Sequence, residues 1–138
     1  MKVRTGAPLA ALALAAFALG CGSSDEKTEE AEHSTTPQQA VAQIAKVRSG
    51  LAKALATYRA GDASAADELV GDTYLKHFEL VEGPLEEVDH ELTEELEDTI
   101  REELREQIRA DAGAARVAAL VREIEAKLHE AEQALSSS

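Results

Sequence analysis

Large apolar side chains recur at helical spacing from Pro37 almost to the end of the 138-residue chain, and this pattern constrains the fold most. Neighbours along the first stripe are three, four or seven residues apart, which places them on one face of a helix: Val41, Ile44, Leu51, Leu55 and Tyr58. Arg48 lies on the same stripe, where its head either reaches solvent or pairs with a carboxylate of another helix. Later segments repeat this period, and the sequence predicts an all-α protein.

Start and stop signals divide the pattern into four helices, at about 37–60, 63–82, 84–110 and 112–135. Thr36, Pro37 and Gln39 have the spacing of a capping box with proline in the first turn. Short connections, among them a Gly83–Pro84 bend, predict an up-down four-helix bundle over residues 37–138. Because Asp111 and Gly113 form a weak boundary, a bent array with the last two helices fused is the alternative.

The first 20 residues have the features of a secretory signal peptide. Lys2 and Arg4 precede an apolar run that ends in Phe-Ala-Leu-Gly before Cys21. This run is shorter than the roughly 20 residues that a membrane-spanning helix needs. Its positive flank favours export.

Cys21 is the only cysteine, which excludes an intramolecular disulfide. The residues before it resemble a bacterial lipobox, so we expect lipid attachment at Cys21; a soluble secreted protein with a spare thiol is the alternative. Two or more acyl chains hold a protein stably on a membrane. Residues 21–36 lack large apolar side chains and predict a disordered acidic tether. The expected location is the outer, extracytoplasmic face of the cell membrane.

The charge of the chain limits its partners. The sequence carries 27 acidic and 14 basic residues, a net charge of −13. Loss of residues 1–20 removes Lys2 and Arg4, so the charge becomes 12 − 27 = −15. Binding to nucleic acid needs a basic footprint, and we therefore expect no nucleic-acid partner. Cations and basic proteins are the favoured partners.

The sequence offers no constellation typical of an enzyme. It has no nucleophile with an adjacent base and no glycine-rich phosphate loop, and we expect a non-enzymatic protein. The Glu87–His90 segment has the Glu-x-x-His spacing of a di-iron bundle, but that architecture needs the motif on two helices. Di-iron chemistry is therefore not expected.

Carboxylates gather around the Gly83–Pro84 bend. If the bend places two helix ends side by side, four of these carboxylates can converge near a histidine. The five candidate metal ligands are Glu79, Glu82, Glu86, Asp89 and His77. Clustered oxygens suit hard cations such as iron, manganese or calcium, and a histidine favours a transition metal. The alternative needs no metal, because acidic residues in a first turn stabilise a helix N-terminus and an inward histidine is usually hydrogen-bonded.

Residues 58–108 resemble the extracytoplasmic helical region of bacterial EfeU-like high-affinity iron permeases. The resemblance rests on a Tyr-x-x-Gly-Asp turn at 58–62, an aromatic-Glu segment followed by Pro-Leu and Asp at 77–89, and a run of Glu97, Arg101 and Arg105. It implies a module that handles or presents iron outside the membrane. It also implies that Glu79, Glu82 and Asp89 are the carboxylates of interest, and that Arg101 and Arg105 are internal charge partners.

The chain departs from the permease itself. The permease conducts iron through transmembrane helices with Arg-Glu-x-x-Glu motifs, whereas the segment at Arg101 reads Arg-Glu-Glu-Leu-Arg. We therefore expect a detached accessory lipoprotein that binds iron or assists an iron permease. The alternative is a structural or adaptor lipoprotein that docks a basic protein and binds no metal.

Overall fold

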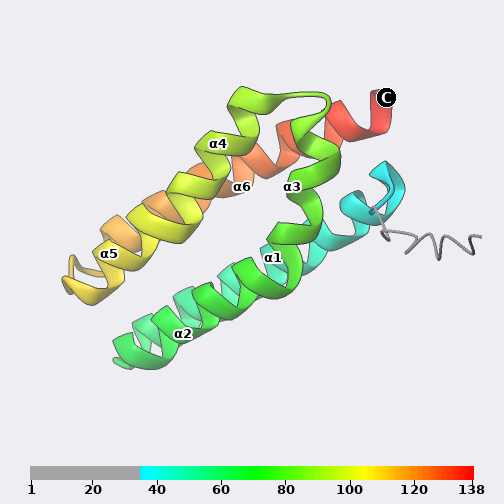
Figure 1. Cartoon of the computed structure of the whole chain (residues 1–138). Helices are drawn as coiled ribbons and strands as arrows, with labels where there is room; N and C mark the ends of the chain where they lie inside the picture. Colours follow the sequence, from blue (N-terminus) through cyan, green and yellow to red (C-terminus); the bar gives the residue numbers. More distant parts are fainter. Residues whose placement is uncertain (1–34) are drawn as a thin grey trace, which may run out of the picture. The chain divides into compact units, whose positions relative to one another are not determined.

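The structure is a computed structural model that describes residues 35–138, and it confirms the all-α helical bundle (Figure 1). The first helix is α1 (Pro37–Arg59). The second runs without interruption through α2 (Ala63–Thr73), a π-helical turn η1 (Tyr74–Phe78) and α3 (Glu79–Glu86). The third comprises α4 (His90–Asp98), a second π-helical turn η2 (Thr99–Leu104) and α5 (Arg105–Arg109). The fourth is α6 (Ala114–Ser137), and residues 35–138 contain no strand.

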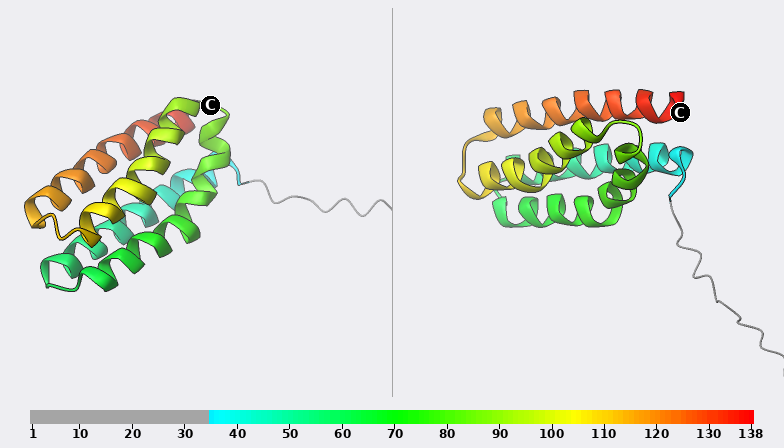
Figure 2. Two further views of the ribbon diagram at one scale, coloured as in Figure 1. Left: turned by 60° about the vertical axis from the view of Figure 1, so that its left-hand side comes forward. Right: turned by 45° about the horizontal axis from the view of Figure 1, so that its top comes forward.

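The four helices alternate in direction, and each packs against its neighbours in sequence. In addition, α1 packs against α6, which closes the ring of contacts (Figures 1 and 2). The expected signal peptide, the lipid attachment at Cys21 and most of the tether lie in residues 1–34, outside the described part of the chain.

Apolar side chains from all four helices form the core. Ile44, Leu51, Phe78, Leu104 and Leu128 are fully buried representatives. Arg48 pairs with Glu132 of α6 at 2.9 Å, with about a third of each side chain exposed. Arg48 therefore forms the expected ion pair with another helix, but the pair lies at the partly exposed edge of the bundle and is not internal.

Two of the expected helix boundaries are confirmed with their caps. Thr36 Oγ1 accepts a hydrogen bond from the Gln39 amide, and the Thr36 amide donates to Gln39 Oε1. Gly61 follows the first helix with φ +94°, a conformation that favours glycine, and the Asp62 side chain caps α2. The local sequence is sufficient to determine this turn.

The expected break at Gly83–Pro84 is wrong, because both residues lie inside α3. The helix ends at Glu86, and the next begins at His90 with Asp89 as its N-cap. Gly83 has no Cβ to meet the proline ring, which removes part of the usual cost of a helical residue before proline. The ribbon changes direction between α2 and α3, and a π-helical turn and a proline are both known causes of such bends (Figure 1).

A tyrosine fixes the loop between the last two helices. The Tyr58 hydroxyl donates to Asp111 Oδ1 at 3.0 Å and accepts from the Gly113 amide at 3.1 Å. Asp111 and Gly113 both have positive φ, 51° and 88°. The last two helices are therefore separate, and the alternative with fused helices is wrong.

Candidate functional site

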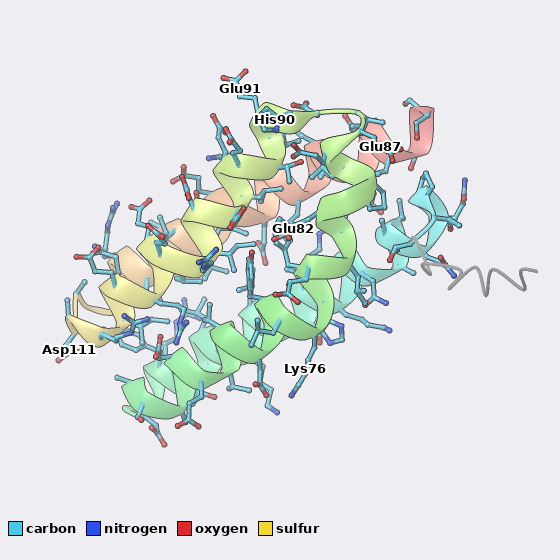
Figure 3. All side chains as sticks on the ribbon, in the orientation of Figure 1. Lys76, Glu82, Glu87, His90, Glu91 and Asp111 are labelled. Atoms are coloured by element: carbon cyan, nitrogen blue, oxygen red, sulfur yellow. The ribbon has the colours of Figure 1, made fainter. Side chains whose placement is uncertain are left out.

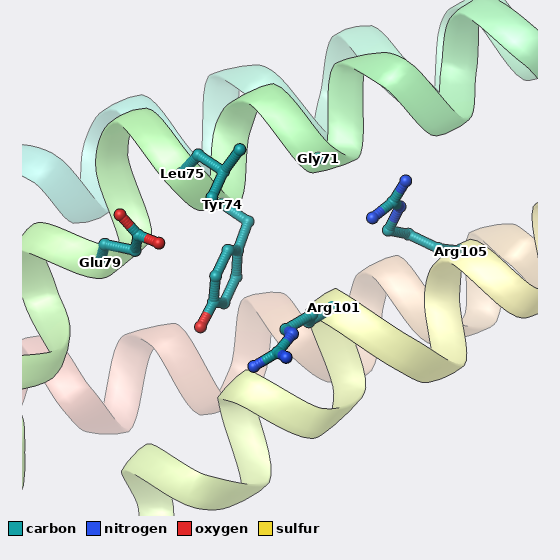
Figure 4. Close-up of a pocket in the computed structure, with 6 residues that line it drawn as sticks. All are labelled: Gly71, Tyr74, Leu75, Glu79, Arg101 and Arg105. Carbon is teal, nitrogen blue, oxygen red and sulfur yellow. The ribbon is translucent and has the colours of Figure 1, made fainter.

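A cleft of about 310 Å³ lies between the second and third helices, and we call it the interhelical cleft. Its lining includes two guanidinium groups, a carboxylate, a phenol and an exposed leucine (Figure 4): Gly71, Tyr74, Leu75, Glu79, Arg101 and Arg105. It brings charged groups of two helices together.

The π-helical turns η1 and η2 both contribute to this cleft. Tyr74 opens η1 and Arg101 lies within η2, and the Arg101 guanidinium carbon lies 6.0 Å from the centre of the Tyr74 ring. π-Helical turns are rare and often mark functional sites. Their presence on both helices at one level distinguishes the cleft from the rest of the bundle.

A hydrogen-bonded pair of side chains borders the cleft. The Tyr74 hydroxyl donates to Glu82 Oε1 at 2.5 Å. Burial raises the pKa of Tyr74, and the neighbouring Glu82 carboxylate raises it further. Burial also raises the pKa of Glu82; the charges of Glu97 and Glu79 add to this effect, while the Tyr74 hydrogen bond and Arg101 oppose it. Three carboxylates therefore interact electrostatically around one phenol.

Three arginines of the third helix pair with carboxylates: one arginine pairs within the same helix, and two pair with α2. Arg101 Nη1 donates to Glu97 Oε1 at 2.6 Å, one helical turn away. Arg105 makes a two-pronged contact with Asp67 of α2, from Nε at 2.7 Å and from Nη2 at 3.1 Å. The hydrogen bond from Arg105 is the main reason that the pKa of Asp67 is lowered. Arg109 reaches the same carboxylate at 3.2 Å.

The structure does not bring the five expected metal ligands together. Glu79 borders the cleft and interacts electrostatically with Glu82, which binds Tyr74. Glu86 instead pairs with His90 Nδ1 at 2.5 Å across the turn between the second and third helices. Figure 3 shows His90 at this turn. No group of three or more metal-binding side chains occurs within residues 35–138.

The other two expected ligands have structural partners. Asp89 accepts a hydrogen bond from the Leu92 amide and so caps α4. His77 Nδ1 lies 3.0 Å from Gln43 Oε1 of α1. These contacts agree with the alternative in which the residues need no metal.

The sequence predicts the charged side-chain pairs more accurately than the metal ligands. Glu97 and Arg101 form the ion pair that their spacing predicts. This pair lies on one helix with 54% of the Arg101 side chain exposed, so the expectation that Arg101 is an internal charge partner is wrong. Arg105 is an interhelical partner, but its carboxylate, Asp67, is missed because 38 residues separate the two. The role of Tyr74 is also missed, since nothing in the local sequence marks a π-helical turn.

Negative charge is concentrated on one part of the bundle. Residues 79–106, which we call the acidic segment, contain 13 of the 27 acidic residues and two of the 14 basic residues. Their net charge of 2 − 13 = −11 compares with −13 for the whole chain. One exposed stripe on the third helix consists of Glu91, Glu94, Asp98 and Glu102, and we call it the acidic stripe.

Exposed apolar side chains accompany the acidic segment. Leu75, Leu80 and Val88 are 59%, 41% and 41% exposed, and they are the large apolar residues that the described bundle leaves most open. Leu80 lies beside Thr35 and Pro37, at the start of α1. The described chain therefore begins close to the acidic segment.

Comparison with protein-family models, curated proteins and solved structures finds no match to this chain. Among the described helices, none combines the length and the apolar character that crossing a membrane requires. Function must therefore be argued from the residues themselves.

Proposed function

We propose that this chain is a binding module and not an enzyme, which a lipid on Cys21 holds at the outer face of the cell membrane. In this proposal the acidic segment docks onto a positively charged surface of a membrane protein. The resemblance to the extracytoplasmic region of EfeU-like permeases implies that this partner is an iron permease.

The charge distribution carries the proposal. The acidic segment holds 11 of the 13 net negative charges of the chain. Exposed like charges repel one another, and a partner of opposite charge relieves this repulsion and accelerates encounter. Leu80 and Val88, both 41% exposed, add apolar area to the same region.

The position of the tether supports a partner in the membrane. Thr35 and Pro37 line one hollow with Leu80 and Glu87 of the second helix, so the described chain begins beside the acidic segment. A lipid on Cys21 would keep this end near the membrane. Anionic headgroups repel carboxylates, and a basic protein surface is therefore a better contact than the lipid itself.

In-cell photocrosslinking tests the docking surface. A photoreactive phenylalanine at position 94, in the acidic stripe, is expected to crosslink to the iron permease, whereas the same group at position 125 on α6 is not. Glu94 and Glu125 are both exposed, which makes the two positions matched. Equal capture from both positions, or capture from neither, would refute the proposed surface. Capture of a different basic protein from position 94 alone would reject the permease as partner.

The anchor has its own test. Radiolabelled palmitate is expected to enter the parent chain and not Cys21→Ala. Equal labelling of the two, or labelling of neither, would contradict lipid attachment at this residue.

Direct iron binding is a second candidate function. Glu82 has a raised pKa to which the carboxylates of Glu97 and Glu79 contribute, and a bound cation would remove this cost. Carboxylate and phenol oxygens suit ferric iron, which would be cargo of the module. These carboxylates are not clustered closely enough to form a metal site as they lie, so the side chains would have to move together around the cation. In this proposal they take the place of the ligands expected at the bend, because Glu86 and Asp89 lie with other partners.

Calorimetry distinguishes the two sets of ligands. If the cleft group binds ferric iron, the triple variant of Glu79→Gln, Glu82→Gln and Glu97→Gln loses the binding. The double variant of Glu86→Gln and Asp89→Asn then retains it. Binding that both variants preserve would exclude both sets of ligands. The absence of binding to the parent chain would eliminate iron binding, and neither result affects the docking proposal.

A further inference from the structure

We infer that the interhelical cleft binds a small zwitterion, with its carboxylate at Arg101 and Arg105 and its ammonium group at Glu79. This inference does not depend on docking through the acidic segment. It rests on the charges that line the cleft and on their arrangement along it.

The two arginines form a pre-positioned anion subsite. Arg105 is held against Asp67 through Nε and Nη2, so its Nη1 is the nitrogen left for another acceptor. Arg101 uses Nη1 on Glu97, and its guanidinium also interacts with the Tyr74 side chain. A guanidinium has five N–H donors, and one carboxylate partner leaves several of them available. Because both side chains are already tethered, binding would cost little side-chain ordering.

The second guanidinium lies against α2 at Gly71. A Cβ at this position would lie 3.5 Å from Arg105 Cζ and 3.6 Å from Arg105 Nη2, which are ordinary contact distances. The guanidinium of Arg105 therefore borders the α2 wall of the cleft.

The opposite charge lies at the other side of the cleft. Figure 4 shows Glu79 on one side of Tyr74 and Leu75, and the guanidinium of Arg105 on the other. Leu75 is 59% exposed, and with the Tyr74 ring it provides an apolar middle. A ligand with separated charges and an apolar body matches this order of groups.

The overall charge argues against a simple anion. The chain has a net charge of −13, and Glu97 and Asp67 already neutralise the two arginines. A lone carboxylate would enter a field that repels it. A zwitterion carries no net charge, and its ammonium group gains from Glu79 and the surrounding carboxylates.

NMR titration of the full chain tests this inference with γ-aminobutyrate and ε-aminocaproate as probes. Saturable shifts are expected at the Gly71 amide and the Leu75 methyl groups. Caproate lacks the ammonium group and pentylamine lacks the carboxylate, so both are expected to bind about tenfold more weakly, the usual consequence of losing one charged contact.

Two substitutions address the two ends of the ligand. Glu79→Gln and Arg101→Gln are each expected to weaken binding of the better probe about tenfold. Both side chains are exposed, with Arg101 at 54%, and the spectra of the variants report directly that they fold. Glu130→Gln and Arg116→Gln are the matched controls on α6; Arg116 is 52% exposed and, like Arg101, pairs with a glutamate.

The outcomes are decisive in either direction. Saturable binding that only the two cleft variants weaken supports the inference. It is overturned if neither probe gives saturable shifts, if caproate binds as tightly as ε-aminocaproate, or if the cleft variants bind like their controls.

Discussion

The first two helices approach each other closely at Gly50, and Gly50→Ala is a sharp test of their packing. A Cβ at this position would lie 2.1 Å from Thr73 Oγ1, 2.7 Å from its Cγ2 and 2.9 Å from its Cβ. Ordinary contacts of this kind are 3.4–4 Å, so the helices must separate or Thr73 must turn. Thr73 is 5% exposed, and its hydroxyl donates to the Leu69 carbonyl at 2.7 Å, which limits its freedom to turn.

Two opposing terms determine the magnitude. Overpacking a well-filled core typically costs about 1–3 kcal/mol. Alanine is about 0.5–1 kcal/mol more favourable than glycine inside a helix. The first term is larger, and the expected net loss for Gly50→Ala is about 0.5–2 kcal/mol.

Urea denaturation followed by circular dichroism measures this loss, and Gly71→Ala is the matched control. A Cβ at Gly71 meets only ordinary contacts, the nearest at 3.5 Å, so the helix-propensity term should raise stability by about 0.5–1 kcal/mol. Thr73→Ala removes Oγ1 and Cγ2, and in that background Gly50→Ala should cost about 1 kcal/mol less. If Gly50→Ala is as stable as the parent, or if its cost is unchanged beside Thr73→Ala, the close approach of these helices is wrong.

Three further predictions concern hydrogen bonds and charges. Tyr58→Phe removes both hydrogen bonds to the 110–113 loop. It should lower the free energy of unfolding by about 1–2 kcal/mol and speed hydrogen exchange of the Gly113 amide. An unchanged exchange rate at Gly113 would contradict the role of Tyr58. Asp67→Asn should destabilise the bundle by about 1–2 kcal/mol at neutral pH. Because the pKa of Asp67 is lowered, the stabilisation by its carboxylate is fully present above the ordinary pKa of about 3.9 and is lost as pH falls through the folded-state pKa. The difference in unfolding free energy between the parent and Asp67→Asn should therefore shrink in acid. A difference that does not change with pH would contradict the ion pair. Glu82 has a raised pKa, so its ionised form is disfavoured in the folded state. Glu82→Gln should therefore stabilise the protein at neutral pH, and this gain in stability should disappear as pH falls through the raised pKa. A variant that is less stable than the parent at neutral pH would contradict the prediction.

Local signals were sufficient for much of the fold. Helical periodicity, the Thr36 capping box and the Gly61 turn depend on neighbouring residues, and each is visible in the sequence. Gly83–Pro84 shows the limit of this approach. Proline usually opens or breaks a helix, but here a helix continues through it, because glycine precedes it and tertiary packing supports the bend.

The cleft could not be derived in the same way. Tyr74 and Glu82 are eight residues apart, which in a regular helix leaves them about 80° apart around the axis. The π-helical turn η1 lies between them and changes this phase, and no local sequence signal marks it. The pairing of Asp67 with Arg105 similarly depends on which helices become neighbours. The electrostatic neighbours of Glu82 follow from the same three-dimensional arrangement.

Binding of charge variants to proteoliposomes that carry the iron permease tests the central claim most directly. One variant neutralises the acidic stripe with Glu91→Gln, Glu94→Gln, Asp98→Asn and Glu102→Gln. Its control removes the same number of charges from exposed positions on the second and fourth helices, with Glu68→Gln, Asp72→Asn, Glu125→Gln and Glu130→Gln.

The proposed docking predicts that the acidic-stripe variant binds the permease at least about tenfold more weakly than the parent, while the control stays within about twofold. Added salt should weaken binding of the parent more than that of the acidic-stripe variant. Equal affinities of the two variants, whether both are reduced or neither is, would contradict a docking surface on the acidic segment.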